Sequence, residues 1–353
     1  MLISLQILRA IAVILVIIVH FSVLAQKNIP ALEIRPFYLG LAGVDIFFVI
    51  SGFIMYYIIS KSGIDKYEFI RHRFFRIYPL YWFYFAILLS LALYSPHLVS
   101  SYHEANLLTS FFLLPSFSPV FLNVSWTLVY EIYFYFIVFV FLVLFKNVKY
   151  FLPFVTLTFA TTFLLSFLTG APEKNAIFLV YGSPLLFEFV MGSFIFYTIR
   201  KYPSLSYKYA IYMLLSSITL FITVHLYYEP LDSYFTSELF NGYIQYGRVI
   251  YYGIPATLFV YSILQFESVL KRSRHLNVRV LTYLGNASYS LYLSHYFILV
   301  FLFKFIDKLS IHVDSLSELV ITLFVFTLLT LAIGSLLYEL IEKRVLKIFG
   351  LRK

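Results

Sequence analysis

Six ionisable residues lie inside stretches of sequence that are otherwise apolar, which makes them the first candidates for chemistry. They are Arg9, His20, Asp45, Glu131, Glu188 and His295. A titratable side chain is costly in hydrocarbon, so it usually faces a cavity or a partner and marks a functional site. A structural hydrogen bond within a helix bundle is the simpler alternative, and we assign no role to Glu188 or His295 from the sequence.

Arg9 and His20 share one face of the first predicted helix. Eleven residues separate them, which returns to within about 20° of the same helix face and places them roughly 16 Å apart along the axis. A single helix face could therefore carry two functional groups. The alternative is that Arg9 extends to the membrane surface and His20 is hydrogen bonded in the bundle.

Asp45 and Glu131 are predicted at nearly the same membrane depth as His20. Counted from the outer ends of their helices, all three lie roughly 6 to 11 Å below the outer surface, at about 1.5 Å per residue. A histidine flanked by carboxylates is more basic and is held in a fixed orientation, as a general base requires. The same cluster could also be a proton relay in a transporter.

Three arginines occupy the segment 71–76 (RHRFFR), before the third predicted span. Arg73 and Arg76 are one helical turn apart and could grip one phosphate together. Basic residues also collect at cytoplasmic helix ends for reasons of topology. The spacing is therefore equally consistent with membrane anchoring.

The elements that carry these residues are predicted to be membrane-spanning helices. Of the 353 residues, 61% are hydrophobic and 12% are charged, whereas charged residues make up about a quarter of a soluble domain. A span needs about 20 largely apolar residues, and ten such runs occur, at 4–24, 40–60, 77–94, 124–145, 150–168, 178–198, 208–228, 248–265, 283–303 and 316–340. We expect an all-α polytopic membrane protein with one transmembrane domain, 1–345, and a basic tail, 346–353.

The loops between the predicted helices alternate between basic and nearly free of basic residues. Nineteen Lys and Arg residues fall on one side, six fall on the other, and Arg9 lies within the first helix. Since positive residues collect on the cytoplasmic side, both termini are predicted to be cytoplasmic. This distribution explains the net charge of +9 through membrane lipid, with no nucleic acid as partner. The absence of cysteine excludes thiolate nucleophiles, disulfides and cysteine-ligated metals.

Five segments, in order along the chain, resemble the acyltransferase 3 family of membrane O-acyltransferases. They are 8–12 (LRAIA) through His20, 43–53 (GVDIFFVISGF), 73–79 (RFFRIYP), 125–131 (SWTLVYE) followed by Phe134 and Tyr135, and 284–295 (LGNASYSLYLSH). Within that family the sequence is most similar to the exopolysaccharide acetyltransferases. The segment 338–343 (YELIEK) departs from the Glu-Arg-Pro-like ending of many members, which is a minor difference.

This resemblance implies a cytoplasmic acyl donor, normally acetyl-CoA, and no metal. It implies a hydroxyl acceptor on a cell-surface glycan or its lipid-linked precursor, with polysaccharide-assembly proteins as candidate partners and the bacterial inner membrane as location. It further implies that Arg9 with His20, and Arg73 with Arg76, are functional pairs. We expect Arg71 to join the latter pair in holding the CoA phosphates.

A pantetheine arm reaching roughly 15 to 20 Å inward past Arg9 would bring its thioester near His20. His20 would then deprotonate the acceptor hydroxyl or take the acyl group itself. Asp45 or Glu131 would stabilise the imidazolium. A proton-coupled transporter or flippase for a glycan or small solute is the alternative function that these residues leave open.

Overall fold

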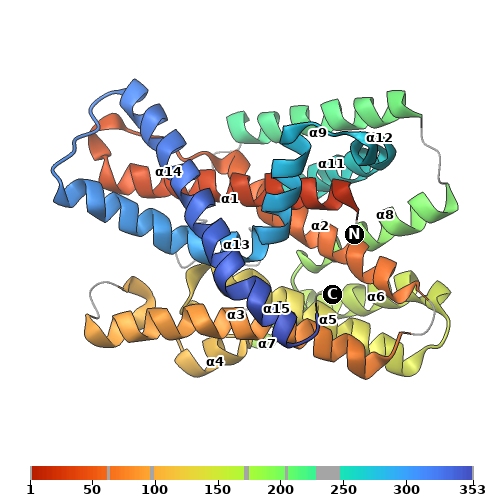
Figure 1. The fold of residues 1–353 in the computed structure, drawn as a ribbon. Helices are drawn as coiled ribbons and strands as arrows, with labels where there is room; N and C mark the ends of the chain where they lie inside the picture. The colour runs from red at the N-terminus through yellow and green to blue at the C-terminus, as the bar shows by residue number, and fades with distance from the viewer. Residues whose placement is uncertain are drawn as a thin grey trace.

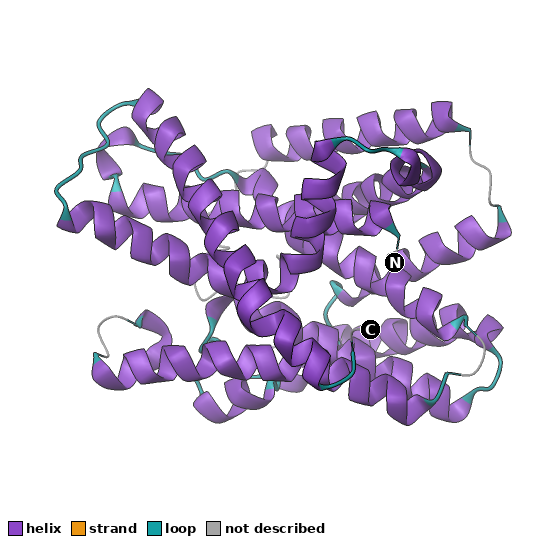
Figure 2. Cartoon of the chain, in the orientation of Figure 1, coloured by secondary structure: helices purple, strands orange, loops and turns teal. Residues whose placement is uncertain are grey.

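The computed structural model describes residues 2–61, 64–95, 99–170, 175–202, 206–227 and 247–351, and every regular element in these ranges is helical (Figure 1; Figure 2). The longer helices are α1 (Ile3–Asn28), α2 (Ala42–Ile59), α3 (Lys66–Tyr94), α5 (Trp126–Leu144), α6 (Phe151–Thr169), α8 (Leu186–Lys201), α9 (Tyr207–Tyr227), α11 (Ile254–Gln265), α13 (Leu276–Lys308) and α14 (Leu316–Leu337). The shorter ones are α4 (Leu107–Phe112), α7 (Ala176–Tyr181), α12 (Glu267–Arg272) and α15 (Lys343–Ile348). Two π-helical turns, Val249–Gly253 and Tyr338–Glu342, precede α11 and α15, and 3₁₀ turns occur at Pro30–Leu32, Tyr38–Leu41, Ser100–Tyr102, Asn123–Ser125 and Val148–Tyr150. The all-α prediction is confirmed over these residues.

Nine helical segments of the described chain are long and apolar enough to cross a membrane, which makes this a multi-pass membrane protein. They match nine of the ten predicted spans. The tenth prediction, 248–265, coincides with the shorter apolar helix Val249–Gln265, which covers roughly 25 Å at 1.5 Å per residue. The predicted tail, 346–353, begins inside α15, and residues 352 and 353 lie outside the described residues.

Helix α3 begins eleven residues before the predicted span, at Lys66. The side chain of Asp65 caps it by accepting a hydrogen bond from the backbone N–H of Glu68 at 2.8 Å, which satisfies an otherwise unpaired donor. Hydropathy detects only the apolar part of this helix. The polar first turns therefore place Arg71, Arg73 and Arg76 on a continuous helix that leads into the membrane-spanning part.

Close approach of backbones sets the packing of α1, which lies between α13 and α2 in the bundle (Figure 1). At Gly285 of α13, an added β-carbon would collide with the backbone of Gln6 in α1. Small residues allow helices to approach closely in membranes, where dispersion contacts stabilise helix association. Gly285 therefore brings the first turns of α13, the helix that also carries His295, against the start of the helix that carries Arg9 and His20.

The first turn of α1 is held by a carboxylate from α12. Glu267 accepts hydrogen bonds from the backbone N–H groups of Ile3 and Ser4, at 3.1 and 2.8 Å, and from the Ser4 hydroxyl at 2.6 Å. Burial raises the pKa of Glu267, but these hydrogen bonds and the ammonium of Lys271 outweigh it, so the net pKa is lowered. These hydrogen bonds pair the free N–H groups at the start of α1 with a side chain that is distant in the sequence, and so hold the two segments together.

Candidate active site

A cavity of about 170 Å³ lies among α1, α2, α3, α5 and α13. It has room for considerably more than one water molecule. Its wall is largely apolar and aromatic, and four charged side chains line it: Arg9 from α1, Arg73 and Arg76 from α3, and Glu131 from α5. The structure thus brings together four of the seven residues expected to form the site.

Arg9 and Arg73 lie in different surroundings. Arg9 is buried, with 7% of its surface exposed. The guanidinium of Arg73 lies over the rings of Phe69 and Tyr135, 5.6 and 5.5 Å from their centroids, which favours a cation over the ring faces. The Nε atom of Arg73 is buried without a hydrogen-bond acceptor, so this face of the cavity contains an unsatisfied donor.

Among the described side chains that line this cavity, Glu131 is the only carboxylate. Its Oε1 atom accepts hydrogen bonds from the hydroxyls of Tyr135 and Ser51, the latter at 3.3 Å. Three guanidinium groups and one carboxylate therefore line the cavity, and the buried carboxylate of Glu342 also interacts electrostatically with Arg9 and Arg76. This balance favours an anionic ligand, because guanidinium groups stay charged and present donors to oxyanions.

Arg71 is separated from this cavity. It lies on the exposed side of α3 and does not contribute to the lining, although Arg73 and Arg76 do. Residues i and i+2 point away from each other on a helix. The expected three-arginine group on α3 is therefore reduced to two, and the third guanidinium comes from Arg9 on α1.

His20 and His295 face each other from α1 and α13. Nε2 of His295 lies 3.3 Å from Nδ1 of His20, and the ring centroids are 4.8 Å apart with planes inclined by 68°. His295 is fully buried, and its Nδ1 lies 2.7 Å from the carbonyl oxygen of Tyr292. Nδ1 of His20 lies 2.8 Å from the carbonyl oxygen of Val16. The histidine to which the sequence assigned no role is thus the ring beside His20.

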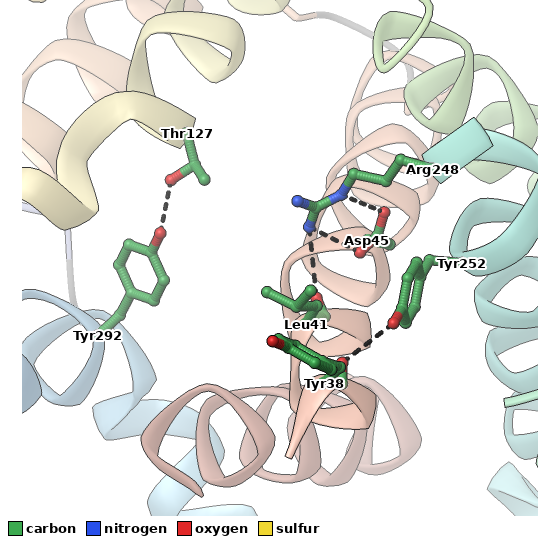
Figure 3. A network of polar contacts seen from close by, with 7 residues as sticks. All are labelled: Tyr38, Leu41, Asp45, Thr127, Arg248, Tyr252 and Tyr292. Carbon is green, nitrogen blue, oxygen red and sulfur yellow. Dashed lines mark hydrogen bonds and ion pairs between the residues drawn. The ribbon is translucent and has the colours of Figure 1, made fainter. Parts of the chain in front are cut away.

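Asp45 is bound by an arginine and not by His20. Its two carboxylate oxygens accept hydrogen bonds from Nε and Nη2 of Arg248, at 3.0 and 2.9 Å, and both side chains are almost fully buried. Figure 3 shows the guanidinium turned toward Asp45 and the carbonyl of Leu41. Neither Asp45 nor Glu131 is hydrogen bonded to His20, so the expected histidine flanked by carboxylates is not formed.

Glu188 is fully buried on α8, where it packs against the π-helical turn that follows Arg248. A β-carbon at Gly253 in that turn would approach the Glu188 carboxylate to 2.8 Å. Glu188 does not line the cavity. Its position thus belongs with the Asp45–Arg248 ion pair and not with the arginines.

Tyr292 connects the cavity to the histidine pair. Its side chain lines the cavity, and its hydroxyl contacts the Thr127 hydroxyl at 2.9 Å and donates to the Val124 carbonyl at 2.8 Å. Figure 3 shows this pair opposite the Arg248 network. The backbone carbonyl of Tyr292, in turn, accepts the hydrogen bond from His295. The arginine cavity and the two imidazoles are therefore consecutive parts of one region of the bundle.

The sequence contains an indication of two of these contacts, that of Tyr135 with Glu131 and that of His295 with His20. Tyr135 is four residues after Glu131 on one helix, a spacing at which side chains meet, and His295 ends the last of the five family-like segments. Arg248 had no such signal, because it joins Asp45 across 203 positions. Within the described ranges, no three His, Cys, Asp or Glu side chains gather as metal ligands would.

Comparisons with known proteins agree with this architecture. A family model described as an acyltransferase domain matches residues 2–339. The chain is 31% identical over 274 residues to the exopolysaccharide production protein ExoZ of Rhizobium meliloti (strain 1021), a match that covers 74% of this chain and 77% of that protein. No solved structure matches.

The helical bundle, its buried basic cavity and the matched domain define a multi-pass membrane acyltransferase. The chain belongs to the acyltransferase 3 family, and it is an O-acyltransferase. The resemblance found in the five sequence segments is thereby confirmed, and the comparisons give no support to the transporter alternative.

Proposed function

We propose that this protein transfers an acetyl or other small acyl group from acyl-CoA to a hydroxyl of an exopolysaccharide or of its lipid-linked precursor. The observation that carries the proposal is the cavity whose charged lining consists of three arginines, Arg9, Arg73 and Arg76, and the carboxylate of Glu131. An excess of fixed positive charge suits the phosphates of CoA. The name of the similar protein from Rhizobium meliloti, which refers to exopolysaccharide production, supports a glycan acceptor.

The donor site is assigned to Arg9, Arg73 and Arg76. Guanidinium groups match phosphate oxygens in charge and in the fork geometry of their donors. The buried Nε of Arg73 has no acceptor among the described residues, and a phosphate oxygen would satisfy it. Arg71, on the exposed side of α3, is left outside this assignment.

The proposal places the arginine end of the bundle on the cytoplasmic side of a bacterial inner membrane, where acetyl-CoA is made. The bias of Lys and Arg toward the loops on that side supports this orientation, with both termini cytoplasmic. Polysaccharide-assembly proteins are the proposed partners. The short α15 and the first turns of α3 would then lie at the same surface as the donor entrance.

The proposed reaction is attack of the acceptor hydroxyl on the thioester carbonyl. Nε2 of His20 takes the hydroxyl proton, the oxygen forms the new ester bond, and the carbon–sulfur bond breaks. The departing thiolate receives the proton that His20 holds, so charge and atoms balance. Transfer through an acyl-histidine would use the same atoms in two steps.

The two carboxylates take other roles than stabilising His20. Glu131, bonded by Tyr135 and Ser51, offsets part of the positive charge in the donor cavity and holds its side chains in place. Asp45 is assigned to the buried ion pair with Arg248, which fixes α2 against the turn that begins α11. Both are therefore proposed as supporting residues.

The test compares surface and secreted polysaccharides from wild-type, deletion, His20→Ala and His312→Ala strains by mass spectrometry. His312 lies in an exposed loop and is the matched control. A base-labile acetyl increment should be present in the wild type and in His312→Ala and missing from the other two, with the His20→Ala protein still inserted in the membrane. Identical glycans in all four strains would refute the proposed acceptor class, and acetylation retained by His20→Ala would refute the role of His20.

A further inference from the structure

The second imidazole, His295, is fully buried and lies within hydrogen-bonding distance of His20. The ring of Tyr296 approaches His20 edge-on, with centroids 5.7 Å apart. The position of the His20 ring is therefore restricted by contacts with α13. Packing alone does not explain why a fully buried imidazole places one of its nitrogens within hydrogen-bonding distance of a nitrogen of a second imidazole.

The protons of the two rings follow from their carbonyl partners. A carbonyl oxygen only accepts, so Nδ1 of His295 carries the proton that it donates to Tyr292 at 2.7 Å. In neutral His295 the remaining nitrogen, Nε2, is then an acceptor. By the same reasoning, Nδ1 of His20 carries a proton, which faces both the Val16 carbonyl at 2.8 Å and Nε2 of His295 at 3.3 Å.

The hydrogen bonds thus run in one direction, from His20 to His295 to the Tyr292 carbonyl. This arrangement leaves the basic lone pair of neutral His20 on Nε2, the atom required for proton abstraction. It resembles the logic by which a carboxylate fixes the tautomer of a catalytic histidine. Here a neutral imidazole takes the place of the carboxylate.

We propose that His295 is a positioning residue for His20, which holds it as the Nδ1-protonated tautomer and accepts a hydrogen bond from the imidazolium formed during acyl transfer. This inference rests on the proposed function, because it assigns His20 as the base. When Nε2 of His20 takes the hydroxyl proton, the ring becomes positive and its Nδ1–H becomes a stronger donor to His295. That proton stays on His20, and the abstracted proton passes to the thiolate.

A neutral partner has a consequence for the number of protons held by the pair. Two adjacent imidazolium ions would repel each other, so one proton beyond the neutral state is the most that the pair stably holds. A carboxylate in place of His295 would instead form a buried ion pair with the protonated base. His295 therefore supports the charged intermediate without introducing a permanent buried charge.

Two substitutions separate the hydrogen bonds of His295. In His295→Asn the amide occupies the region of Nδ1 and can still donate to Tyr292, but nothing reaches His20. In His295→Gln the side chain is one bond longer, so its carbonyl oxygen reaches the region of Nε2 and can accept from His20. Both variants are amides of ordinary size, and they differ in which partner they keep.

The experiment measures transfer of radiolabelled acetyl from acetyl-CoA to polysaccharide in isolated membranes, with kcat and the donor KM for each variant. We expect His295→Asn to lower kcat by roughly 100-fold, within the range of general base catalysis, with the donor KM unchanged. His295→Gln should remain within about tenfold of the wild type, which is the loss expected for one hydrogen bond. A purely structural role predicts no such difference.

Each outcome decides a separate question. Wild-type membranes that do not use acetyl-CoA would refute the proposed function itself. If the wild type is active and His20→Ala is inactive, a His295→Asn enzyme with unchanged kcat would overturn the inference. Equal loss in His295→Gln and His295→Asn, with equal thermal unfolding in detergent, would also overturn it, since the acceptor at the Nε2 position would then be irrelevant.

Discussion

Removing the guanidinium of Arg73 tests the donor cavity most directly. Arg73 lines the cavity and carries an unsatisfied Nε, so Arg73→Ala should remove a charged hydrogen bond to the donor phosphates. Such a bond contributes about 1.5 to 3 kcal/mol, and 1.4 kcal/mol corresponds to a tenfold change in affinity. We therefore expect the KM for acetyl-CoA to rise about 10- to 150-fold, with kcat little changed.

Arg71→Ala is the matched control, because it removes the same charge from the same helix only two positions away. Arg71 is exposed and does not line the cavity, so its loss should change the donor KM by less than about twofold, in line with the small contribution of exposed charges. Initial rates in isolated membranes at varied acetyl-CoA give both values. An equal rise for the two variants would show that the net charge of this end of the bundle, and not the cavity, governs donor binding.

Three further predictions concern stability and packing. Asp45→Asn should destabilise the protein by about 3 to 5 kcal/mol, because Arg248 would stay buried and charged, whereas Asp45→Leu with Arg248→Met should recover most of the loss in detergent unfolding; equal stability of the two variants would contradict this. Since the pKa of Glu267 is lowered by folding, its contribution to stability is present above pH 4.5 and is lost as the pH falls below that value. In Glu267→Gln the unfolding temperature should therefore fall less steeply with acid than in the wild type, and the same pH profile in both proteins would refute this. Gly285→Val should separate α13 from α1 and abolish acyl transfer, and normal activity would contradict the close approach.

Much of the fold could be predicted because lipid requires spans of a minimum apolar length. Nine of ten predicted spans have counterparts of that kind. The start of α3 could not be found in this way, since residues 66–76 are too polar for a hydropathy search. The cap at Asp65 was the local signal that the helix begins earlier.

The site was predicted only in part, because contacts between helices that are far apart in the sequence do not follow from helical periodicity or from membrane depth. Helical periodicity related Arg73 to Arg76 because both lie on one helix. Membrane depth, however, has no information about direction around the helix axis, so Asp45 and Glu131 were placed beside His20 although they face other partners. The actual neighbour of His20 comes from α13, 275 positions away, where no local pattern relates the two residues.

The continuity of α1 acts as a molecular ruler under the proposed function. Arg9 and His20 belong to one uninterrupted helix of 26 residues, so their separation of roughly 16 Å does not depend on the conformation of any loop. The donor must therefore reach from its phosphates to the base along a path of set length. If the arm between the phosphates and the thioester were shortened, the phosphates could not contact the arginines while the thioester lay at His20. The enzyme would therefore select its donor by the length of this arm as well as by its charge.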